Sequence, residues 1–338
     1  MEDLEVKFRA MYEKDKQKYI KSWMVTWDYQ VKRKKRGVKY KEGKPEDFYS
    51  YNGPQDLVKW MGWFDVNFTT YLPDSLTGPL INKSFETDKR IINELGLKFE
   101  FPNYAASSGI NNAHDFIYPQ FYPVPERQKI KTVLDFGAGC GRQANLWATS
   151  SDDMTYVGMD AIPNSYCLQH LYYSHLGVKL YDYMDNPEIF SFDSNKKGIY
   201  HIPTWRYDLL PDGYFDMVIC VQVLQELNTT LVETMLTQFH RILKPGGMLY
   251  IRDHATKWQP ATKLNIDKYL SRNGFTLEFS PYTIDPEDVH GIVRIWRKND
   301  PRIIESRQRS FKAGLRQIAE DIDALSGGSL RKIRQKMK

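Results

Sequence analysis

Cysteine is scarce in this sequence. Only Cys140, Cys167 and Cys220 occur among 338 residues, and they are widely spaced. An odd, scattered set argues against a disulfide-stapled scaffold, and it lacks the close Cys and His pairs of a zinc site. We therefore expect reduced thiols, no metal and a cytoplasmic protein.

Long apolar runs are also missing. No stretch reaches the length that a membrane-spanning helix needs, and the first ten residues, MEDLEVKFRA, lack the apolar centre of a signal peptide. Hydrophobic residues make up 41% of the chain and charged residues 26%, as in globular proteins with one large core and a smaller unit. We expect no membrane partner.

Positive charge is concentrated at the two ends. Residues 1–44 hold 14 Lys and Arg against 7 Asp and Glu, and residues 302–338 hold 10 against 4, so the middle is acidic within a net charge of +5. The clusters at 32–36 and 331–336 have the charge to bind RNA phosphates. Such runs are more often solvated faces, and no RNA-binding motif accompanies them. Nucleic acid is therefore a partner that we keep open but do not favour.

The most informative stretch is TVLDFGAGCGR at 132–142, which lacks the third glycine of a dinucleotide-binding motif. An apolar run and Asp135 precede glycines at 137, 139 and 141, which let the backbone turn sharply before the helix expected at 143–148. A dinucleotide site requires G-x-G-x-x-G, and Arg142 occupies the last of those positions. Alone, the stretch is equally compatible with a tight strand-to-helix loop.

Further landmarks follow in order. A second expected strand, 154–160, ends in Asp160, an acid able to accept both hydrogen bonds of a ribose diol. The run FDMVICV at 215–221 reads as a strand buried on both faces. Apolar residues at helical spacing over 231–243 precede Lys-Pro-Gly-Gly and a strand at 248–251. We also expect a helix at 262–273 and strands at 275–279 and 291–297.

Together these landmarks resemble class I S-adenosylmethionine-dependent methyltransferases over residues 130–298. The resemblance implies an α/β fold with a doubly wound, mostly parallel seven-stranded sheet whose last strand is reversed, and S-adenosylmethionine as cofactor. The residues at matching or neighbouring positions, which we predict to bind the cofactor, are Asp135, Gly137, Ala138, Gly139, Arg142, Asp160, Ala161, Trp205, Cys220 and Gln222.

The sequence departs from the family at the adenine side. The family commonly has an acid where this chain has Thr204, so we expect Trp205 beside the adenine, with core packing as the alternative. The polar and aromatic spacer between Gly177 and Lys197 is unusual, and we expect it to be an insertion over the site.

Residues 45–129 are rich in aromatic side chains that must be buried. We predict that 1–129 form a mainly helical cap, with helices at 56–68 and 85–95 and an extended linker at 118–125. We predict that residues 130–298 form the methyltransferase domain, and that residues 299–338 hold an amphipathic helix over 304–325 and a basic tail. We expect that helix to dock on the cap, with homodimerisation as the alternative.

The strand at 215–221 continues into Cys220-Val221-Gln222-Val223, which differs from the Asn/Asp-Pro-Pro-aromatic tetrad of the related amino-group methyltransferases. We therefore favour a small-molecule acceptor, most simply a hydroxyl of a sugar or secondary metabolite. Its proton needs a base, and we predict His254, with Asp253 beside it on the opposite face of the strand. The alternative bases are His114, Asp115, Tyr118 and Glu226. The alternative functions are an RNA methyltransferase and a non-catalytic cofactor-binding module.

Overall fold

The computed structural model describes residues 4–19, 51–63, 72–121, 130–253, 264–280 and 291–300. The chain divides into two compact units, 1–298 and 299–338, and nearly all described residues belong to the first. The predicted C-terminal helix and both basic clusters lie outside the described residues. Of the helices that are described, none combines the length and apolar character needed to cross a membrane.

One eight-stranded sheet forms the centre of the first unit, in the order β3-β4-β2-β1-β5-β6-β8-β7. All neighbours pair in parallel except β8, which runs antiparallel to β6 and to β7. The strands are β1 (Thr132–Phe136), β2 (Thr155–Asp160), β3 (Leu180–Asp182), β4 (Gly198–Pro203), β5 (Phe215–Val221), β6 (Leu243–Asp253), β7 (Phe275–Phe279) and β8 (Ile292–Lys298).

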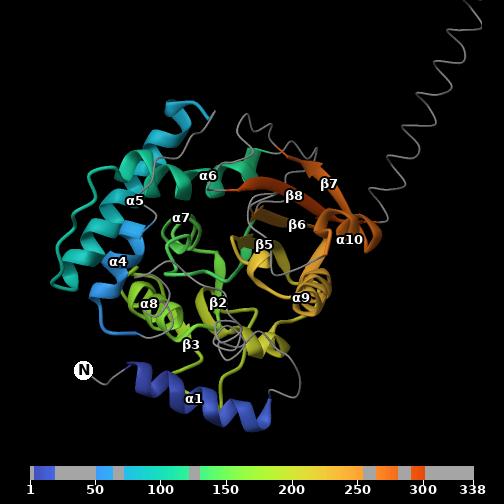
Figure 1. Ribbon diagram of the computed structural model, residues 1–338, viewed down its shortest axis with the longest axis horizontal. Coiled ribbons are helices and arrows are strands. Elements are labelled where there is room, and N and C mark those ends of the chain that lie inside the picture. The colour runs from blue at the N-terminus through green and yellow to red at the C-terminus, as the bar shows by residue number, and fades with distance from the viewer. Residues whose placement is uncertain are drawn as a thin grey trace, which may run out of the picture. The chain divides into compact units, whose positions relative to one another are not determined.

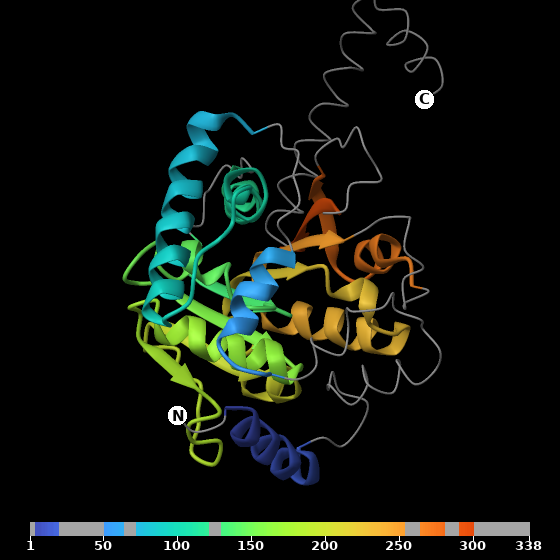
Figure 2. The same ribbon diagram turned by 60° about the vertical axis from the view of Figure 1, so that its left-hand side comes forward.

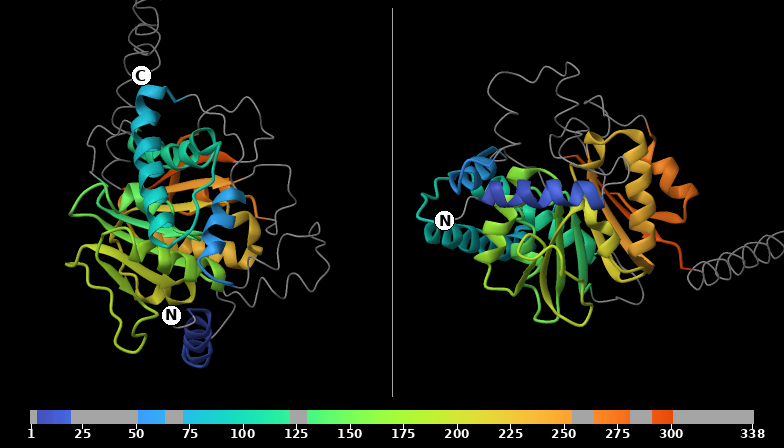
Figure 3. Two further views of the ribbon diagram at one scale, coloured as in Figure 1. Left: turned by 90° about the vertical axis from the view of Figure 1, so that its left-hand side faces the viewer. Right: turned by 90° about the horizontal axis from the view of Figure 1, so that it is seen from below.

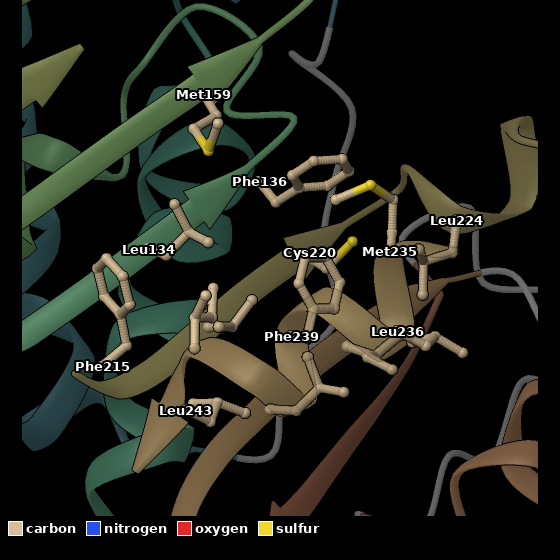
Figure 4. Close-up of a cluster of buried hydrophobic side chains, with 14 of the residues drawn as sticks. Leu134, Phe136, Met159, Phe215, Cys220, Leu224, Met235, Leu236, Phe239 and Leu243 are labelled. Atoms are coloured by element: carbon tan, nitrogen blue, oxygen red, sulfur yellow. The ribbon is translucent and has the colours of Figure 1, made fainter. Parts of the chain in front are cut away.

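Helices cover both faces of this sheet (Figure 1). Side chains alternate along β1, so that Leu134 and Phe136 pack on one face and Val133 on the other. The first face is covered by α9 (Thr229–Ile242) and α10 (Ile266–Arg272). Figure 4 shows part of this core, where Phe136 faces Met235 and Phe239 of α9. The second face is covered by α7 (Ala144–Trp147), α8 (Pro163–Ser174) and the N-terminal helices.

The α/β fold class and the reversed last strand are confirmed, but the sheet has one strand more than the seven predicted. The extra strand is β3, which the spacer after Gly177 adds at the edge beside β4. Asp182 at its end accepts hydrogen bonds from His201 Nδ1 of β4 at 2.6 Å and His170 Nδ1 of α8 at 2.7 Å. These bonds hold the added strand to its neighbours.

The N-terminal region is helical in its described parts. Its elements are α1 (Leu4–Lys18), α4 (Gln55–Trp63), α5 (Asp74–Glu94), the short η1 (Tyr104–Ala106) and α6 (Ser108–Phe121). Figure 2 shows α6 end-on between α5 and the sheet, and Figure 3 shows α1 lying across the side of the molecule seen from below. The remaining short helices are η2 (Thr204–Leu209) and η3 (Leu224–Glu226).

The predicted cap helices were placed correctly but with the wrong limits. The helix expected from 85 begins at Asp74, and the last residues of the one expected at 56–68 lie outside the described residues. The extended linker predicted from Tyr118 is wrong up to Phe121, because α6 continues through Pro119. Ile117 and Tyr118 are buried there, and this packing offsets the cost of a proline inside a helix.

Candidate active site

The glycine turn follows β1 where the strand order reverses, with β2 on one side and β5 on the other. Ligands of open α/β sheets bind outside the carboxyl ends of the strands at such a point. Gly137, Gly139 and Gly141 have φ of 73°, 59° and 84°, in the left-handed region that favours glycine. The amides of Gly137 and Ala138 donate to Met159 O at 2.8 and 3.1 Å, which fixes the turn against β2.

Asp160 lies at the carboxyl end of β2, directly beside this turn. Its Oδ1 accepts from the amides of Ala161 at 2.7 Å and Ile162 at 3.0 Å, and its Oδ2 accepts from the Gly139 amide at 3.2 Å. Burial raises the pKa of Asp160 to about 6, although these bonds oppose the rise. The group is therefore mainly ionised at pH 7, as an acceptor of ribose hydroxyls must be.

Close neighbours leave no room for side chains on the turn. A Cβ at Gly137 would lie 2.3 Å from Val223 Cγ2, and one at Gly139 would lie 3.1 Å from Cζ2 of the Trp60 indole of α4. The ligand therefore meets bare backbone here. A bare, left-handed turn beside a buried carboxylate fits the methionine and ribose parts of S-adenosylmethionine.

Arg142 has a different environment from the rest of the turn. Its Nε lies 3.3 Å from Asp88 Oδ2 of α5, and its Nη2 donates to the Ser108 carbonyl at the start of α6. The guanidinium thus joins the turn to the N-terminal helices. Its predicted contact with the cofactor stays a prediction.

Trp205 lies in an aromatic cluster beneath α1. The indole is 0% exposed and meets the rings of Phe8 and Tyr12 edge-on at 5.8 and 5.1 Å, while its Nε1 donates to Asp15 at 2.8 Å. Ala161 belongs to the same cluster. The geometry is that of the core-packing alternative, and the adenine contacts of Trp205 and Ala161 stay predictions. Because Ala161 and Trp205 follow β2 and β4, α1 covers the carboxyl ends of these strands.

The end of β5 has an unusual backbone. Gln222 has φ of 61°, and it is the one non-glycine residue in the left-handed region within the part of the chain that the structure describes. Such strained residues are found preferentially at functional sites. Its amide donates to Arg252 O at 2.8 Å. Cys220 precedes it, fully buried against the α9 face, and burial raises the pKa of its thiol.

Asp135 faces the opposite side of the sheet from Cys220. Its Oδ2 accepts from Tyr156 OH at 2.6 Å. Burial raises the pKa of Asp135 to about 7, and the charges of Asp115 and Asp160 raise it further. At neutral pH this carboxyl group is therefore close to half protonated.

The candidate bases are distributed around the end of β6. His254 lies outside the described residues, so its predicted role is neither supported nor contradicted. Asp253, the last residue of β6, is 2% exposed. Asp115 is fully buried and accepts from Arg252 Nε at 2.8 Å and Nη2 at 2.7 Å, so both of its oxygens are used in bonds within the fold. His114 and Tyr118 lie on the same helix, with their rings 4.2 Å apart.

Sequence reasoning missed that three buried aspartates connect the N-terminal helices to the sheet. Asp15 of α1 accepts a hydrogen bond from the Trp205 indole. Asp88 of α5 accepts from Asn145 Nδ2 at 3.0 Å and pairs with Arg142, and Asp115 of α6 pairs with Arg252. A signal was present for Asp88, which lies at helical spacing with buried Ser84, Ile91 and Ile92. An acid on the apolar face of a helix indicates a buried partner.

One described cluster, His170, Asp182 and His201, has residue types that hold metals, with candidate ligand atoms within 4.8 Å of one another. Both imidazole Nδ1 atoms bond to the same carboxylate oxygen. Hydrogen bonding accounts for this arrangement, because co-ligands of one tetrahedral ion stand farther apart than 2.6 Å. The absence of a metal stays a prediction.

Several solved structures are similar to this chain. The CurJ carbon methyltransferase has 13% identity and a TM-score of 0.39, with 67% of this chain and 68% of that chain covered. A 1,6-didemethyltoxoflavin-N1-methyltransferase from Burkholderia thailandensis has 14% identity and a TM-score of 0.38, covering 70% and 95%. The StiE O-MT has 15% identity and a TM-score of 0.39, covering 55% and 74%.

The family comparison is decisive. A family described as a methyltransferase domain matches residues 112–298, more than half of the chain. The chain belongs to this family and is a class I S-adenosylmethionine-dependent methyltransferase, as the ordered landmarks predicted. S-adenosylmethionine is its cofactor. The match begins within α6, so the helix that carries Asp115 is part of the family domain.

Proposed function

We propose that this methyltransferase transfers the methyl group to a hydroxyl of a small molecule, such as a sugar or a secondary metabolite. The observation that carries this proposal is that N-terminal helices of the chain lie over the carboxyl ends of the strands. Trp60 of α4 lies against Gly139, α1 covers Trp205, and α6 is tied to β6 through Asp115. A site covered by the chain's own helices suits a small acceptor better than a polynucleotide.

The end of β5 supports oxygen as the accepting atom. In the related amino-group enzymes a prolyl and aromatic tetrad receives the nitrogen, and this chain has Cys220-Val221-Gln222-Val223. Bound S-adenosylmethionine supplies an electrophilic methyl group on a positively charged sulfur. The protein's own task is to position the acceptor, exclude water and receive the hydroxyl proton.

A labelling experiment tests this function. The purified protein is incubated with methyl-tritiated S-adenosylmethionine and, separately, with a metabolite fraction below 3 kDa and with total RNA. We expect label in the low-molecular-mass fraction, in a product whose methyl group resists mild base as an ether does. Asp160→Ala serves as the control with weakened cofactor binding. Transfer of label to RNA, with binding that falls steeply as salt rises, would overturn the proposal in favour of the RNA methyltransferase.

A further inference from the structure

Asp253 ends β6 at the carboxyl edge of the sheet, next to the strained end of β5. Arg252, the residue before it, pairs with Val221 of β5, and Asp253 itself pairs with Ile292 of β8. Its carboxylate is on the α9 face, since Ile251 and Leu249, two and four residues earlier, pack there. The position is therefore two strands from β1 at the same edge of the sheet, on the side where we place the acceptor if the cofactor occupies the turn after β1.

The carboxylate of Asp253 is buried, and no side chain of the described residues donates a hydrogen bond to it. Neither oxygen has a partner in good hydrogen-bond geometry among the described residues, although the backbone amides of Val223 and Gln222 at the end of β5 lie near enough to lower its pKa. The nearest cation among the described residues, Arg294 Nη2 of β8, lies 4.0 Å away, and that guanidinium donates to Asp267 of α10 at 2.8 Å. A buried carboxylate in this condition opposes folding.

The other buried aspartates show that this condition is exceptional. Among the described residues, Asp15, Asp88, Asp115, Asp160 and Asp182 each accept two or more hydrogen bonds from side chains or backbone amides. Asp135, which is also buried, accepts a hydrogen bond from Tyr156 OH. A carboxylate that the fold leaves without such donors is available to a donor from outside the chain.

We propose that Asp253 is a catalytic residue that takes the proton of the acceptor's hydroxyl group during methyl transfer. This inference rests on the proposed function. As the oxygen–carbon bond forms and the carbon–sulfur bond breaks, the electron pair of the broken bond stays on sulfur. The hydroxyl proton moves to a carboxylate oxygen of Asp253. The carboxylate and the sulfonium both become neutral, so charge and atoms balance.

The surroundings of Asp253 suit a proton acceptor. Burial raises its pKa to about 6, while Arg294, Arg252 and the amides of Val223 and Gln222 oppose the rise. Among the described residues the Cys220 thiol is a further titratable neighbour, and its raised pKa keeps it neutral. Asp253 is thus ionised at pH 7, yet more basic than an exposed carboxylate, which is the range that general-base catalysis favours.

The test uses the full-length Asp253→Asn protein, with Asp152→Asn on an exposed turn as the matched control. Stability comes first, because it needs no acceptor. We expect the melting temperature of Asp253→Asn at pH 8 to equal or exceed that of the native protein, since a buried charge without side-chain donors is removed. Calorimetric affinity for S-adenosylhomocysteine should change less than twofold. A clear fall in melting temperature would show that the carboxylate is structural and would overturn the proposal.

Catalysis is measured with the labelled metabolite fraction under single-turnover conditions. We expect Asp253→Asn to lower the rate at least 100-fold, and we expect the rise in the native rate through about pH 6 to disappear in the variant. An unchanged rate or pH profile would overturn the role of Asp253. If the native protein instead labels RNA or no hydroxyl compound, the proposed function fails, and the proton-acceptor role of Asp253 fails with it. The stability measurement then still decides whether the carboxylate is structural.

Discussion

Replacing Asp115 should expose how strongly α6 is bound to the sheet. The carboxylate accepts four hydrogen bonds, from Tyr250 OH at 2.5 Å, Arg252 Nε at 2.8 Å, Arg252 Nη2 at 2.7 Å and Gln143 Nε2 at 2.9 Å. The Arg252 side chain is only 4% exposed. Asp115→Asn keeps the shape but leaves that guanidinium without a counter-charge.

The expected cost follows from the burial of both groups. Breaking a fully buried ion pair from one side costs about 3–5 kcal/mol, a large part of the roughly 5–15 kcal/mol that stabilises a folded protein. In a unit of this size we expect a melting temperature lower by about 10 °C. Urea unfolding followed by circular dichroism measures the free energy directly.

A second variant separates charge from contact. In Asp115→Leu/Arg252→Met both charges are removed, so no buried charge remains unpaired, and at least half of the stability lost in Asp115→Asn should return. Asp152→Asn, an exposed substitution of the same type, should change the free energy of unfolding by less than about 0.5 kcal/mol. The reasoning is wrong if Asp115→Asn costs under about 1 kcal/mol. It is also wrong if the double variant is no more stable than the summed effects of Asp115→Leu and Arg252→Met, each measured alone, predict.

Further predictions concern the glycine turn, Asp160, Asp135 and His254. Gly139→Val should abolish binding of S-adenosylhomocysteine in calorimetry, because φ of 59° and the Trp60 indole exclude a branched side chain; an affinity within threefold of the native one would count against the turn as the cofactor site. Asp160→Ala should weaken that affinity at least 10-fold by removing the ribose acceptor, and unchanged affinity would refute the assignment. If Asp253 takes the proton, His254→Ala should leave both cofactor affinity and the single-turnover rate intact, whereas a fall in rate as large as that of Asp253→Asn would favour His254 as the base. For Asp135, whose folded pKa of about 7 lies above the unfolded value, the stability contribution is greatest below about pH 4 and is lost as pH rises to 7, by about 4 kcal/mol. Unfolding at pH 5 and pH 8 should therefore show a smaller loss of stability for Asp135→Asn than for the native protein, and an equal loss would mean that Asp135 titrates normally.

The central domain was predictable because each strand combines a local pattern with a termination signal. Phe215–Val221 and Phe275–Phe279 match the predicted strands residue for residue, since apolar runs after Pro-Asp-Gly or Asn-Gly turns leave little choice of boundary. Strand β3 escaped prediction because three residues at a sheet edge leave almost no periodic pattern. The bonds that hold it come from His170 and His201, which are distant in sequence.

The parts of the site that could be predicted are those set by backbone conformation or by a position at the end of a strand. The turn and Asp160 follow from glycine spacing and from an acid at the end of a strand. Side-chain roles depended on the fold: Arg142 and Trp205 occupy positions next to cofactor motifs, yet their polar atoms bond to Asp88 and Asp15 on remote helices. The sequence favoured His254 over Asp253 as the base, and the case for Asp253 comes from its burial and from the lack of side-chain donors around it in the fold.

The aspartates of the N-terminal helices also bear on how the chain folds as it is synthesised. Asp115 leaves the ribosome well before Arg252, its partner 137 positions later, and Asp15 precedes Trp205 by 190. Until those donors emerge, burying the early helices would leave carboxylates without partners. Burial is therefore unfavourable at this stage, and we expect these helices to remain solvent-exposed. The last strands of the sheet would then complete the assembly of the first helices. A chain interrupted before β6 should accordingly fail to protect α6 from proteolysis.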